Sequence, residues 1–365
     1  MGAMDDHSVG NQPDFSRSAV HRILDANLDR AREGLRTIEE WCRFGLNEGT
    51  LTEECKQLRQ ELARWHTPDI RAARDTLADV GTDLTHAQEE QRQSITHLLQ
   101  ANFSRIQEAL RVLEEYGKLY SSEMGAACKK MRYRVYTLDS QLTGQQRHQR
   151  LGRSPLYLVT SPQENLLSAV EAALQGGLSL VQYRDKTADD TTRLQRGKDL
   201  CELCHRYNAL FIMNDRVDLA LAVNADGVHL GQQDIPIALA RQILGTNRII
   251  GRSTTNPDEL HQAIQDGADY VGVGPVYETP TKAGKAAAGL GYVRYAAEHC
   301  PIPWYAIGGI DADNLTHVLG AQAERVAIVR AIMQAEQPTL ITQYVLSQLH
   351  RVQMMRASQT PAVSP

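Results

Sequence analysis

Eight short apolar runs alternate with helix-length stretches through the second half of the 365-residue chain. This alternation constrains the fold strongly, because parallel strands need a long crossover, usually a helix, between them. We predict strands at residues 156–160, 180–184, 210–215, 227–231, 249–253, 270–276, 304–308 and 325–329. Eight strand–helix units in about 200 residues predict a compact (β/α)8 (TIM) barrel. An open doubly wound sheet is the alternative, but it would need fewer strands or a reversal of strand order.

The first half of the chain is helical instead. Residues 18–140 carry apolar side chains at helical spacing over long stretches and contain few glycines after Gly49. Residues 26–41 recur as residues 101–116, with the same Ala-Asn start, Arg spacing and Glu-Glu-aromatic end. Two copies are too few for a stacked solenoid and predict a pseudo-twofold bundle. The fold class is therefore α/β, with an all-α domain that contains an internal two-fold repeat in front of the barrel.

Composition marks the boundaries between these parts. Residues 1–16 are polar, lack periodicity and contain Gly10 and Pro13, so we expect a flexible tail. Residues 141–153 are polar and contain two glycines, which favours a linker. The predicted organisation is a flexible tail at 1–16, the all-α domain at 17–140, the linker at 141–153, the barrel domain at 154–350 and a flexible tail at 351–365.

Overall composition excludes several classes of protein. A net charge of −5, with no basic half, argues against a nucleic-acid partner. The apolar runs are far shorter than the ~20 residues of a membrane span, and no charged-then-apolar leader opens the chain. We expect a cytoplasmic, multidomain protein with small-molecule substrates and no membrane partner, and a homo-oligomer is compatible with the sequence. Six Cys without framework spacing predict free thiols, and Cys201-x-x-Cys204 favours buried helix thiols over a zinc or redox site.

Polar residues directly after the predicted strands form the candidate site, because barrel enzymes place their chemistry at the carboxyl ends of the strands. Alternation along the second strand directs Gln182, Arg184 and Lys186 to one side. Further strands are followed by two acids and another lysine, namely Asp215, Asp234 and Lys282. This mixture suits a polyphosphate held through a divalent metal, since carboxylates are hard ligands for Mg²⁺ and Mg²⁺ also binds phosphate oxygens.

A second anion site is predicted at the seventh and eighth strands. Gly308-Gly309 follows the seventh strand, and a helix begins near Arg330 after the eighth. Backbone N–H groups and a helix N-terminus favour a phosphate dianion there, although two glycines could also make no more than a tight turn. His229 lies between apolar neighbours on the fourth strand, where a packed or rim histidine is at least as expected as a catalytic one.

Five successive motifs resemble those of the thiamine-phosphate synthase family, in the family's order over roughly residues 155–349. They are Val181-Gln182-Tyr183-Arg184-Asp185-Lys186, Ile212-Met213-Asn214-Asp215-Arg216, Gly227-Val228-His229-Leu230-Gly231-Gln232-Gln233-Asp234, Val273-Gly274-Pro275-Val276-Tyr277 with Thr279-Pro280-Thr281-Lys282, and Ala306-Ile307-Gly308-Gly309-Ile310.

The resemblance implies a role for each matching position. It assigns the pyrimidine diphosphate to Gln182, Tyr183, Arg184, Asp185, Lys186, Asn214, Ser253 and Lys282. It assigns Mg²⁺ to Asp215 and Asp234, and the thiazole phosphate to Thr279, Pro280, Thr281, Gly309, Val329 and Arg330. Catalytic roles fall on Arg184, Lys186, Ser253 and Lys282. The family often has a small hydroxyl residue at the position of Arg330, so the role of this arginine stays open.

The implied reaction is a transfer in thiamine biosynthesis. A pyrimidine diphosphate is coupled to a thiazole carboxylate phosphate, giving thiamine phosphate, diphosphate and CO₂. Negative charge develops on the leaving diphosphate, so a metal and cationic side chains stabilise the transition state. The attacking thiazole nitrogen has a free lone pair and needs no general base. The alternative is a thiazole tautomerase-like barrel, which has no need for a diphosphate–metal site.

The helical half resembles a small domain often fused to this synthase, for which a hydroxymethylpyrimidine-phosphate kinase activity has been proposed. Its repeat places Asn, Arg, Glu and Arg three residues apart along one side of a helix, at Asn27, Arg30, Glu33 and Arg36 and again at Asn102, Arg105, Glu108 and Arg111. These residues predict either a phosphate-binding cleft, for which bidentate Arg is suited, or surface salt bridges on an assembly module. The chain contains no G-x-x-x-x-G-K-[ST] loop.

Overall fold

The computed structural model describes residues 15–74, 94–278 and 286–357. The chain divides into two compact units, Met1–Leu142 and Thr143–Pro365. The predicted tail at 1–16 lies almost wholly outside the described residues, and so does the part of the predicted tail at 351–365 that follows residue 357. Residues 351–357 differ from that expectation, because they continue the last helix of the barrel unit.

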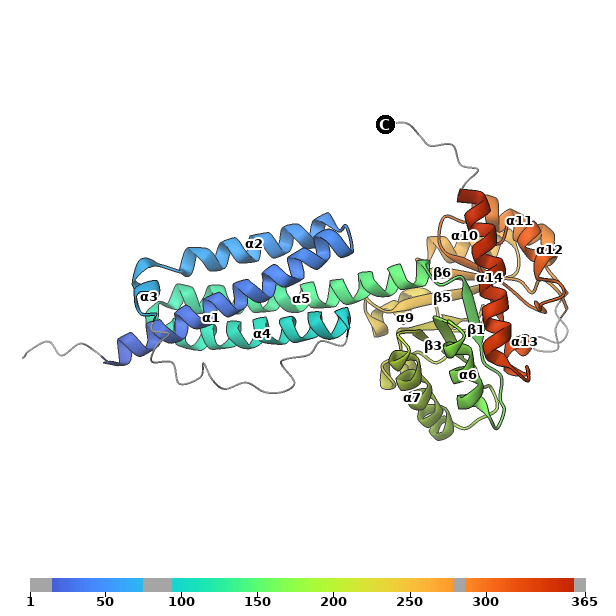
Figure 1. Ribbon diagram of the computed structural model, residues 1–365, viewed down its shortest axis with the longest axis horizontal. Coiled ribbons are helices and arrows are strands. Elements are labelled where there is room, and N and C mark those ends of the chain that lie inside the picture. The colour runs from blue at the N-terminus through green and yellow to red at the C-terminus, as the bar shows by residue number, and fades with distance from the viewer. Residues whose placement is uncertain (1–14, 75–93, 279–285, 358–365) are drawn as a thin grey trace, which may run out of the picture. The chain divides into compact units, whose positions relative to one another are not determined.

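The first unit is all-α, as predicted. Its elements are α1 (Phe15–Glu40), the π-helical turn η1 (Trp41–Gly45), α2 (Gly49–Trp65), α3 (Pro68–Ala72), α4 (Ile95–Tyr120) and α5 (Ser122–Gly152), of which the last continues into the second unit (Figure 1). The two repeat copies lie on α1 and α4, which pack against each other. A Cβ atom on Gly34 would lie 2.7 Å from Ile106 Cγ1, so glycine permits the close approach of these two helices.

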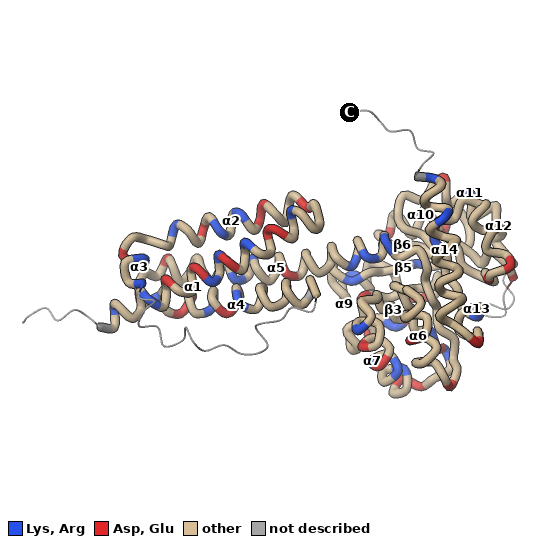
Figure 2. Tube along the Cα trace, viewed as in Figure 1, with Lys and Arg blue, Asp and Glu red and all other residues tan. Residues whose placement is uncertain are grey.

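The helices of this unit are amphipathic. Leu24, Leu28, Ala31, Leu35 and Ile38 of α1 recur every three to four residues and are fully buried in the core of the unit. Acidic and basic residues are interspersed along α1 and α2 (Figure 2). This pattern explains why the sequence periodicity identified the helices so clearly.

The second unit is the predicted barrel, with parallel strands in the order β1 to β8 and β8 paired back to β1. The strands are β1 (Leu156–Val159), β2 (Leu180–Tyr183), β3 (Leu210–Asn214), β4 (Gly227–Leu230), β5 (Ile249–Thr254), β6 (Tyr270–Val273), β7 (Trp304–Ile307) and β8 (Val326–Ile328). The outer helices are α6 (Leu166–Gln175), α7 (Asp190–Arg206), α8 (Val217–Ala222), α9 (Ile237–Leu244), α10 (Pro257–Gln265), α11 (Gly289–His299), α12 (Leu315–Gly320), α13 (Arg330–Met333) and α14 (Pro338–Ala357). Each predicted strand coincides with an observed one.

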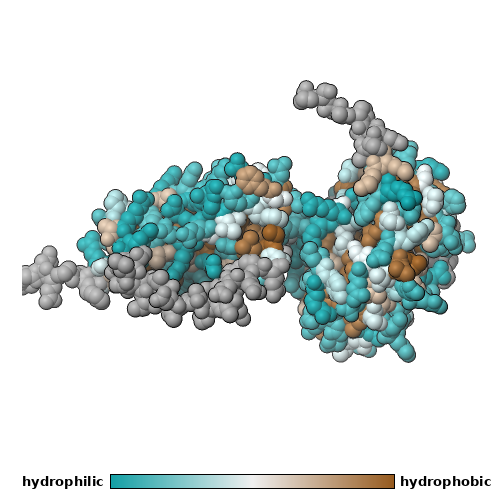
Figure 3. Space-filling view, in the orientation of Figure 1, coloured by the Kyte–Doolittle hydropathy of each residue, from teal (hydrophilic) through white to brown (hydrophobic). Residues whose placement is uncertain are grey.

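Side-chain alternation divides the barrel into two cores. Residues such as Val181 and Tyr183 point outward and pack under the surrounding helices. Their neighbours Leu180, Leu210 and Ile212 point inward and fill the barrel interior, together with three tyrosines described below. The face of the molecule in Figure 3 is mainly hydrophilic with scattered apolar side chains. No helix among the described residues is long and apolar enough to cross a membrane.

The predicted linker at 141–153 is helical in the structure, because α5 extends to Gly152. A Cβ atom on Gly144 would lie 2.9 Å from Asn247 Oδ1, so this glycine allows the helix to approach the barrel closely rather than breaking it. Arg150 donates a hydrogen bond of 2.7 Å to the Asn208 carbonyl, and His148 Nε2 lies 3.0 Å from Asp269 Oδ1. The polar residues of the stretch therefore have partners on the barrel.

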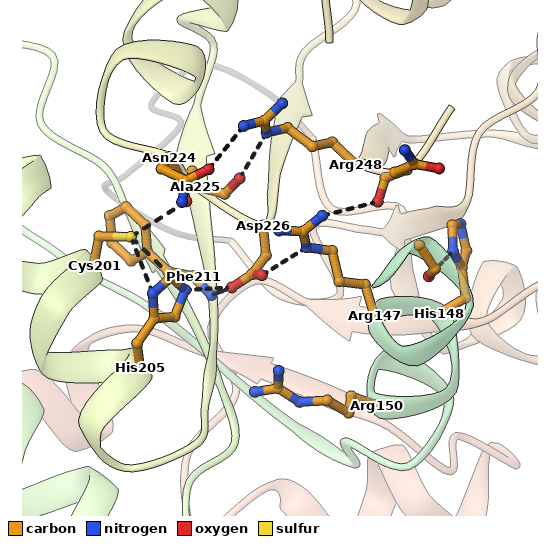
Figure 4. Close-up of polar contacts among 12 residues, drawn as sticks. Arg147, His148, Arg150, Cys201, His205, Phe211, Asn224, Ala225, Asp226 and Arg248 are labelled. Carbon is orange, nitrogen blue, oxygen red and sulfur yellow. Dashed lines mark hydrogen bonds and ion pairs between the residues drawn. The ribbon is translucent and has the colours of Figure 1, made fainter. Parts of the chain in front are cut away.

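Asp226 is the centre of this polar network (Figure 4). Its carboxylate accepts hydrogen bonds from Arg147 Nε at 2.8 Å, His205 Nε2 at 3.0 Å and the Phe211 backbone N–H at 3.0 Å. Burial opposes ionisation of Asp226, but the His205 hydrogen bond and the charges of His205 and Arg147 outweigh it and lower its pKa to about 2. The hydrogen bond to Asp226 in turn raises the pKa of His205 to about 10.

As expected, the six cysteines are free, including the buried Cys201 beside His205.

The His205–Asp226 pair makes stability depend on pH. A histidine whose pKa is raised on folding contributes stability that is complete below its unfolded pKa, about 6.5, and is lost as the pH rises toward 10. The Asp226 contribution is present above about pH 4 and is lost only in acid. We expect the melting temperature of the barrel to fall between pH 6.5 and 10, and His205→Gln to make this fall shallower. Thermal unfolding followed by circular dichroism across this range measures the effect.

His350→Gln is the matched control, because His350 is an exposed histidine of α14. This variant should keep the wild-type pH dependence. A decline in His205→Gln that is as steep as in the wild type would contradict the assignment.

Candidate functional site

A cavity of about 360 Å³ opens at the carboxyl ends of the barrel strands. It is lined by Tyr157, Val159, Gln182, Arg184, Asn214, His229, Ser253, Pro275, Ile307, Gly308, Gly309, Ile310, Asp311, Ala327, Val329, Arg330, Ala331 and Gln334. Seven of the predicted site residues therefore line the same cavity: Gln182, Arg184, Asn214, Ser253, Gly309, Val329 and Arg330. These side chains come from loops and strands that lie far apart in the sequence.

A smaller cavity of about 200 Å³ lies beside the first, and Asn214 lines both. Lys186 and Asp215 line the smaller one, together with Tyr183 and Asp185. Tyr183 belongs to the outward face of β2 and packs under the helices, so it does not reach the larger cavity. Asp185 is buried and accepts hydrogen bonds from the backbone N–H groups of residues 187 and 188, which fixes the loop after β2.

Two acids converge at the rim of the barrel. Asp215 follows β3 with a positive φ of 61°, a conformation that is uncommon for a residue other than glycine. Its Oδ2 lies 2.9 Å from Lys186 Nζ, and its carboxyl faces that of Asp234. Asp234 is held in place by the Gly231 backbone N–H, which donates to Oδ2 at 2.6 Å.

The surroundings of the two acids shift their pKa values in opposite directions. Burial opposes ionisation of Asp215, but its hydrogen bonds with Lys186 and Asp234 outweigh this and lower its pKa. Burial and the neighbouring Asp215 raise the pKa of Asp234. Two carboxyls that face each other in this way form a site that a divalent cation would suit.

The turn after β7 places two glycines in the left-handed region. Gly308 has φ 111° and Gly309 has φ 67°. A Cβ atom would lie 2.6 Å from Pro275 Cα at Gly308 and 2.8 Å from Tyr277 Cβ at Gly309, so side chains are excluded at both positions. Asn314 Nδ2 donates to the Gly309 carbonyl at 2.7 Å and fixes the turn. The backbone is therefore exposed to the cavity without a covering side chain.

A chain of buried hydrogen bonds forms the floor of the cavity. Gln182 Nε2 donates to the Tyr157 hydroxyl at 2.6 Å, and this hydroxyl lies 2.7 Å from that of Tyr270. The Tyr270 hydroxyl lies 2.9 Å from His229 Nδ1, and His229 Nε2 lies 2.9 Å from Ser253 Oγ. Because the amide nitrogen of Gln182 is used by Tyr157, its carbonyl oxygen is the group left to face a ligand.

Sequence reasoning missed several cavity residues. Tyr157 lines the cavity but lies within β1 rather than after it, so the search of strand ends did not reach it. The same holds for Tyr270 of β6, which contacts the cavity residues Tyr157 and His229. Asp311 lines the cavity two residues beyond the glycine pair, and its polar character at a strand end was the available signal. For His229 the sequence favours a packed or rim position at least as much as a catalytic one, and in the structure this side chain is both buried and part of the cavity wall.

Four predicted residues, Thr279, Pro280, Thr281 and Lys282, lie outside the described residues. Arg330 is exposed at the cavity and begins the short helix α13. Arg184 lines the cavity as well, and within the described part of the chain its guanidinium has no ion-pair partner. This cationic side chain is thus available to an anionic ligand.

The repeated residues of the helical unit have partners within the protein. Asn27 and Asn102 are buried, and each donates at 2.8 Å to a backbone carbonyl one turn earlier in its helix. Arg36 pairs with Glu39 and Glu40, and Arg111 pairs with Glu114 and Glu115. The remaining members Arg30, Glu33, Arg105 and Glu108 are exposed. Around these residues the described structure shows surface ion pairs and hydrogen bonds from side chains to carbonyls of their own helix, rather than a shared cleft.

These observations define a (β/α)8-barrel enzyme with an acid pair, free cationic groups and an exposed glycine backbone around one rim. Residues 156–332 match the family model described as thiamine monophosphate synthase, and residues 22–141 match the ThiD2 family. The chain belongs to the thiamine-phosphate synthase family.

Individual relatives support this assignment over nearly the whole chain. A thiamine-phosphate synthase of Nostoc sp. strain PCC 7120 is 71% identical over 92% of this chain and 96% of its own length. One from Synechocystis sp. strain PCC 6803 is 67% identical over 92% of this chain and 98% of its own length. Among solved structures, a thiamine phosphate pyrophosphorylase of Pyrococcus furiosus has a TM-score of 0.51 and 38% identity, and the match covers 55% of this chain and 98% of that one.

The hydroxyls of Tyr157 and Tyr270 should stabilise the barrel cooperatively. Removing one hydroxyl leaves its buried partner without a hydrogen bond, at a cost of about 1–3 kcal/mol. We expect Tyr157→Phe and Tyr270→Phe to show a coupling free energy on the order of 1 kcal/mol in a double-mutant cycle. Denaturant unfolding of the barrel measures it.

Tyr292→Phe provides the control, because the Tyr292 hydroxyl makes a separate buried hydrogen bond of 2.6 Å to Thr254 Oγ1. Its effect should add to that of Tyr157→Phe. Strict additivity of the Tyr157 and Tyr270 variants would show that their hydroxyls act independently.

Proposed function

We propose that the barrel couples 4-amino-2-methyl-5-(diphosphooxymethyl)pyrimidine with a thiazole phosphate to form thiamine phosphate and diphosphate. CO₂ is released as well when the thiazole carries a carboxylate. One observation carries this proposal: Gln182 and the cationic Arg184 border the same cavity as the backbone of Gly309, which no side chain covers. Two substrates that each bear phosphate can therefore lie in one cavity with their reacting atoms between these walls.

Arg184 and Lys186 form the diphosphate end of the proposed site. Arg184 offers a guanidinium that can contact two phosphate oxygens, and Lys186 lies next to the acid pair. Asp185 and Tyr183 support this end from behind, since Asp185 fixes the loop and Tyr183 packs under the helices. Lys282 of the same proposed set belongs to the segment outside the described residues.

The pyrimidine lies, in this proposal, over the hydrogen-bonded floor. The carbonyl oxygen of Gln182 accepts from the exocyclic amino group, because the amide nitrogen already donates to Tyr157. Asn214 and Ser253 border the same part of the cavity. His229 holds the Ser253 hydroxyl and so orients it toward the ring.

Asp215 and Asp234 fit a Mg²⁺ ion, because two facing carboxyls can both be ionised only when positive charge lies close to them, and carboxylate oxygens are hard ligands that Mg²⁺ prefers. When bound, Mg²⁺ would supply positive charge that stabilises the departing diphosphate. Lys186 neutralises part of the same charge and contacts Asp215 directly.

The phosphate of the thiazole lies against the turn after β7. Gly309 exposes its backbone there, and Val329 and Arg330 border the same side. The thiazole nitrogen attacks the pyrimidine methylene carbon with its own lone pair, so no side chain has to remove a proton for the C–N bond to form. Incubation with both substrates and Mg²⁺, followed by chromatographic detection of thiamine phosphate, tests the proposal.

The ThiD2 match over residues 22–141 supports a second activity for the helical unit, a pyrimidine-phosphate kinase that would supply the diphosphate. An assembly module is the competing proposal. ATP-dependent conversion of the pyrimidine monophosphate by the full chain separates the two.

Loss of one acid of the pair should impair coupling. We expect Asp215→Asn and Asp234→Asn each to lower turnover on the order of 10–100-fold, because a metal-bridged diphosphate loses a ligand. Initial rates over a range of Mg²⁺ concentrations check this result. Asp218→Asn changes an exposed acid in the first turn of α8 that pairs with Arg216, and this variant should keep normal activity. Full activity of Asp215→Asn after EDTA treatment would exclude the metal assignment.

The two walls should respond differently to substitution. Arg184→Ala should raise the KM for the pyrimidine diphosphate much more than that for the thiazole phosphate. Gly309→Ala should do the reverse, because a Cβ there meets Tyr277 and covers the backbone that the phosphate approaches. Steady-state kinetics with each substrate varied in turn gives both constants. Equal losses for both substrates in both variants would contradict the arrangement.

A further inference from the structure

A cluster of ionisable side chains lies in the helical unit, separate from the barrel cavity. Asp25 and Asp29 are one turn apart on α1, His66 follows α2, and Arg74 follows α3. Asp25 and His66 are 4–5% exposed, which is unusual for two groups of this kind unless each has a partner. Neither the coupling reaction nor the repeated ion pairs of this unit involve them.

His66 is the informative residue. Its Nε2 lies 2.7 Å from Asp25 Oδ1, so these two atoms share a proton or another cation. Its Nδ1 is buried and has no hydrogen-bond partner among the residues that the structure describes. The atom nearest to it in the cluster, Asp29 Oδ1, is 3.7 Å away, which is too long for a hydrogen bond. A buried ring nitrogen is therefore directed at a carboxylate oxygen with nothing between them.

This arrangement is that of a cation site. A ring nitrogen that carries no hydrogen and a carboxylate oxygen are both acceptors, so a proton or a metal ion has to lie between them for the contact to be favourable. One ligand atom from each of Asp25, Asp29 and His66 lies within 4.8 Å of the other two. Ligands at about 2.0–2.2 Å from one metal ion lie at most about 4.4 Å apart, so small side-chain movements bring these atoms to the spacing that an ion requires.

Arg74 already supplies one positive charge to the cluster. Its guanidinium donates to Asp25 Oδ2 at 2.7 Å and Oδ1 at 3.0 Å, and it also contacts Asp29. The side chain is 48% exposed, so it approaches the acids from the solvent side, whereas His66 lies on the buried side. Two carboxylates and one guanidinium together carry a net charge of −1.

We propose that Asp25, Asp29 and His66 bind a divalent metal ion of the Zn²⁺ type, with Arg74 as the counterion that the metal displaces. The mixed nitrogen and oxygen ligands select ions of this borderline class over Ca²⁺ and Mg²⁺, which prefer oxygen ligands only. Three protein ligands leave at least one position open, as in sites that bind a further ligand. The inference does not depend on either activity proposed above.

Co²⁺ is the probe for this site, because its visible absorption reports a nitrogen-containing ligand set. The full-length chain is stripped with a chelator, freed of any purification tag, and carries Asp215→Asn and Asp234→Asn so that the barrel acids do not contribute. We expect one equivalent of Co²⁺ to bind with a visible band, and one equivalent of Zn²⁺ to abolish this band. Absence of stoichiometric Co²⁺ binding in this background would overturn the proposal.

Two further variants separate a metal site from a purely structural ion pair. Asp29→Asn, at a partly exposed position, should weaken Co²⁺ binding at least about 10-fold while the far-ultraviolet spectrum stays unchanged. Arg74→Gln should leave binding as strong or strengthen it, since it removes the competing cation. Glu54→Gln, which removes an ion pair with Arg134 elsewhere in the unit, is the control and should bind normally. Unchanged binding in Asp29→Asn, or loss of binding in Arg74→Gln, would overturn the proposal.

Discussion

The pairing of β8 with β1 is the constraint on which the rest of the barrel unit depends. Leu156 lies beside Val326 and Leu158 beside Ile328 in this last parallel pair, and the sheet then has no free edge. Because the strands are parallel and the sheet is closed, the carboxyl ends of all the strands lie around one rim. Residues separated by more than a hundred positions, such as Arg184 and Gly309, therefore border the same cavity. An open sheet of the same strands would leave these two residues on opposite edges.

The closed barrel has to be filled, and tyrosines do much of this. The rings of Tyr157, Tyr270 and Tyr305 make edge-on contacts at centroid distances of 5.2–5.8 Å. Burial raises the pKa of all three hydroxyls, which therefore stay protonated and can donate hydrogen bonds. Tyr305 donates to the Leu151 and Ser154 carbonyls below, whereas Tyr157 and Tyr270 contact the cavity floor above. One packed layer thus satisfies polar groups at both ends of the barrel.

Much of this could be predicted from the sequence, because strands buried on both faces produce apolar runs whose spacing reports the fold. Residues at the carboxyl ends of those runs, such as Asn214 and Ser253, follow directly from the same reasoning. The interior tyrosines do not, since their role depends on which residues face each other across the closed barrel. Gly144 shows the opposite error: a glycine that suggested a linker in fact accommodates a close approach between a helix and Asn247. His66 lay in no motif, because its partners on α1 are distant in the chain.

Helix α5 has a consequence for how such proteins can be recombined. Its last residues, including Arg147, complete the polar network around the buried Asp226. The natural division of the chain therefore lies at Leu142, inside a continuous helix, rather than at a flexible junction before β1. A gene fusion or exchange that cut at residue 153 would transfer a barrel in which the buried carboxylate of Asp226 lacks its partner Arg147. The part of the chain that can be exchanged as a unit, in evolution or in protein engineering, is therefore the barrel together with the helical segment that begins at residue 143.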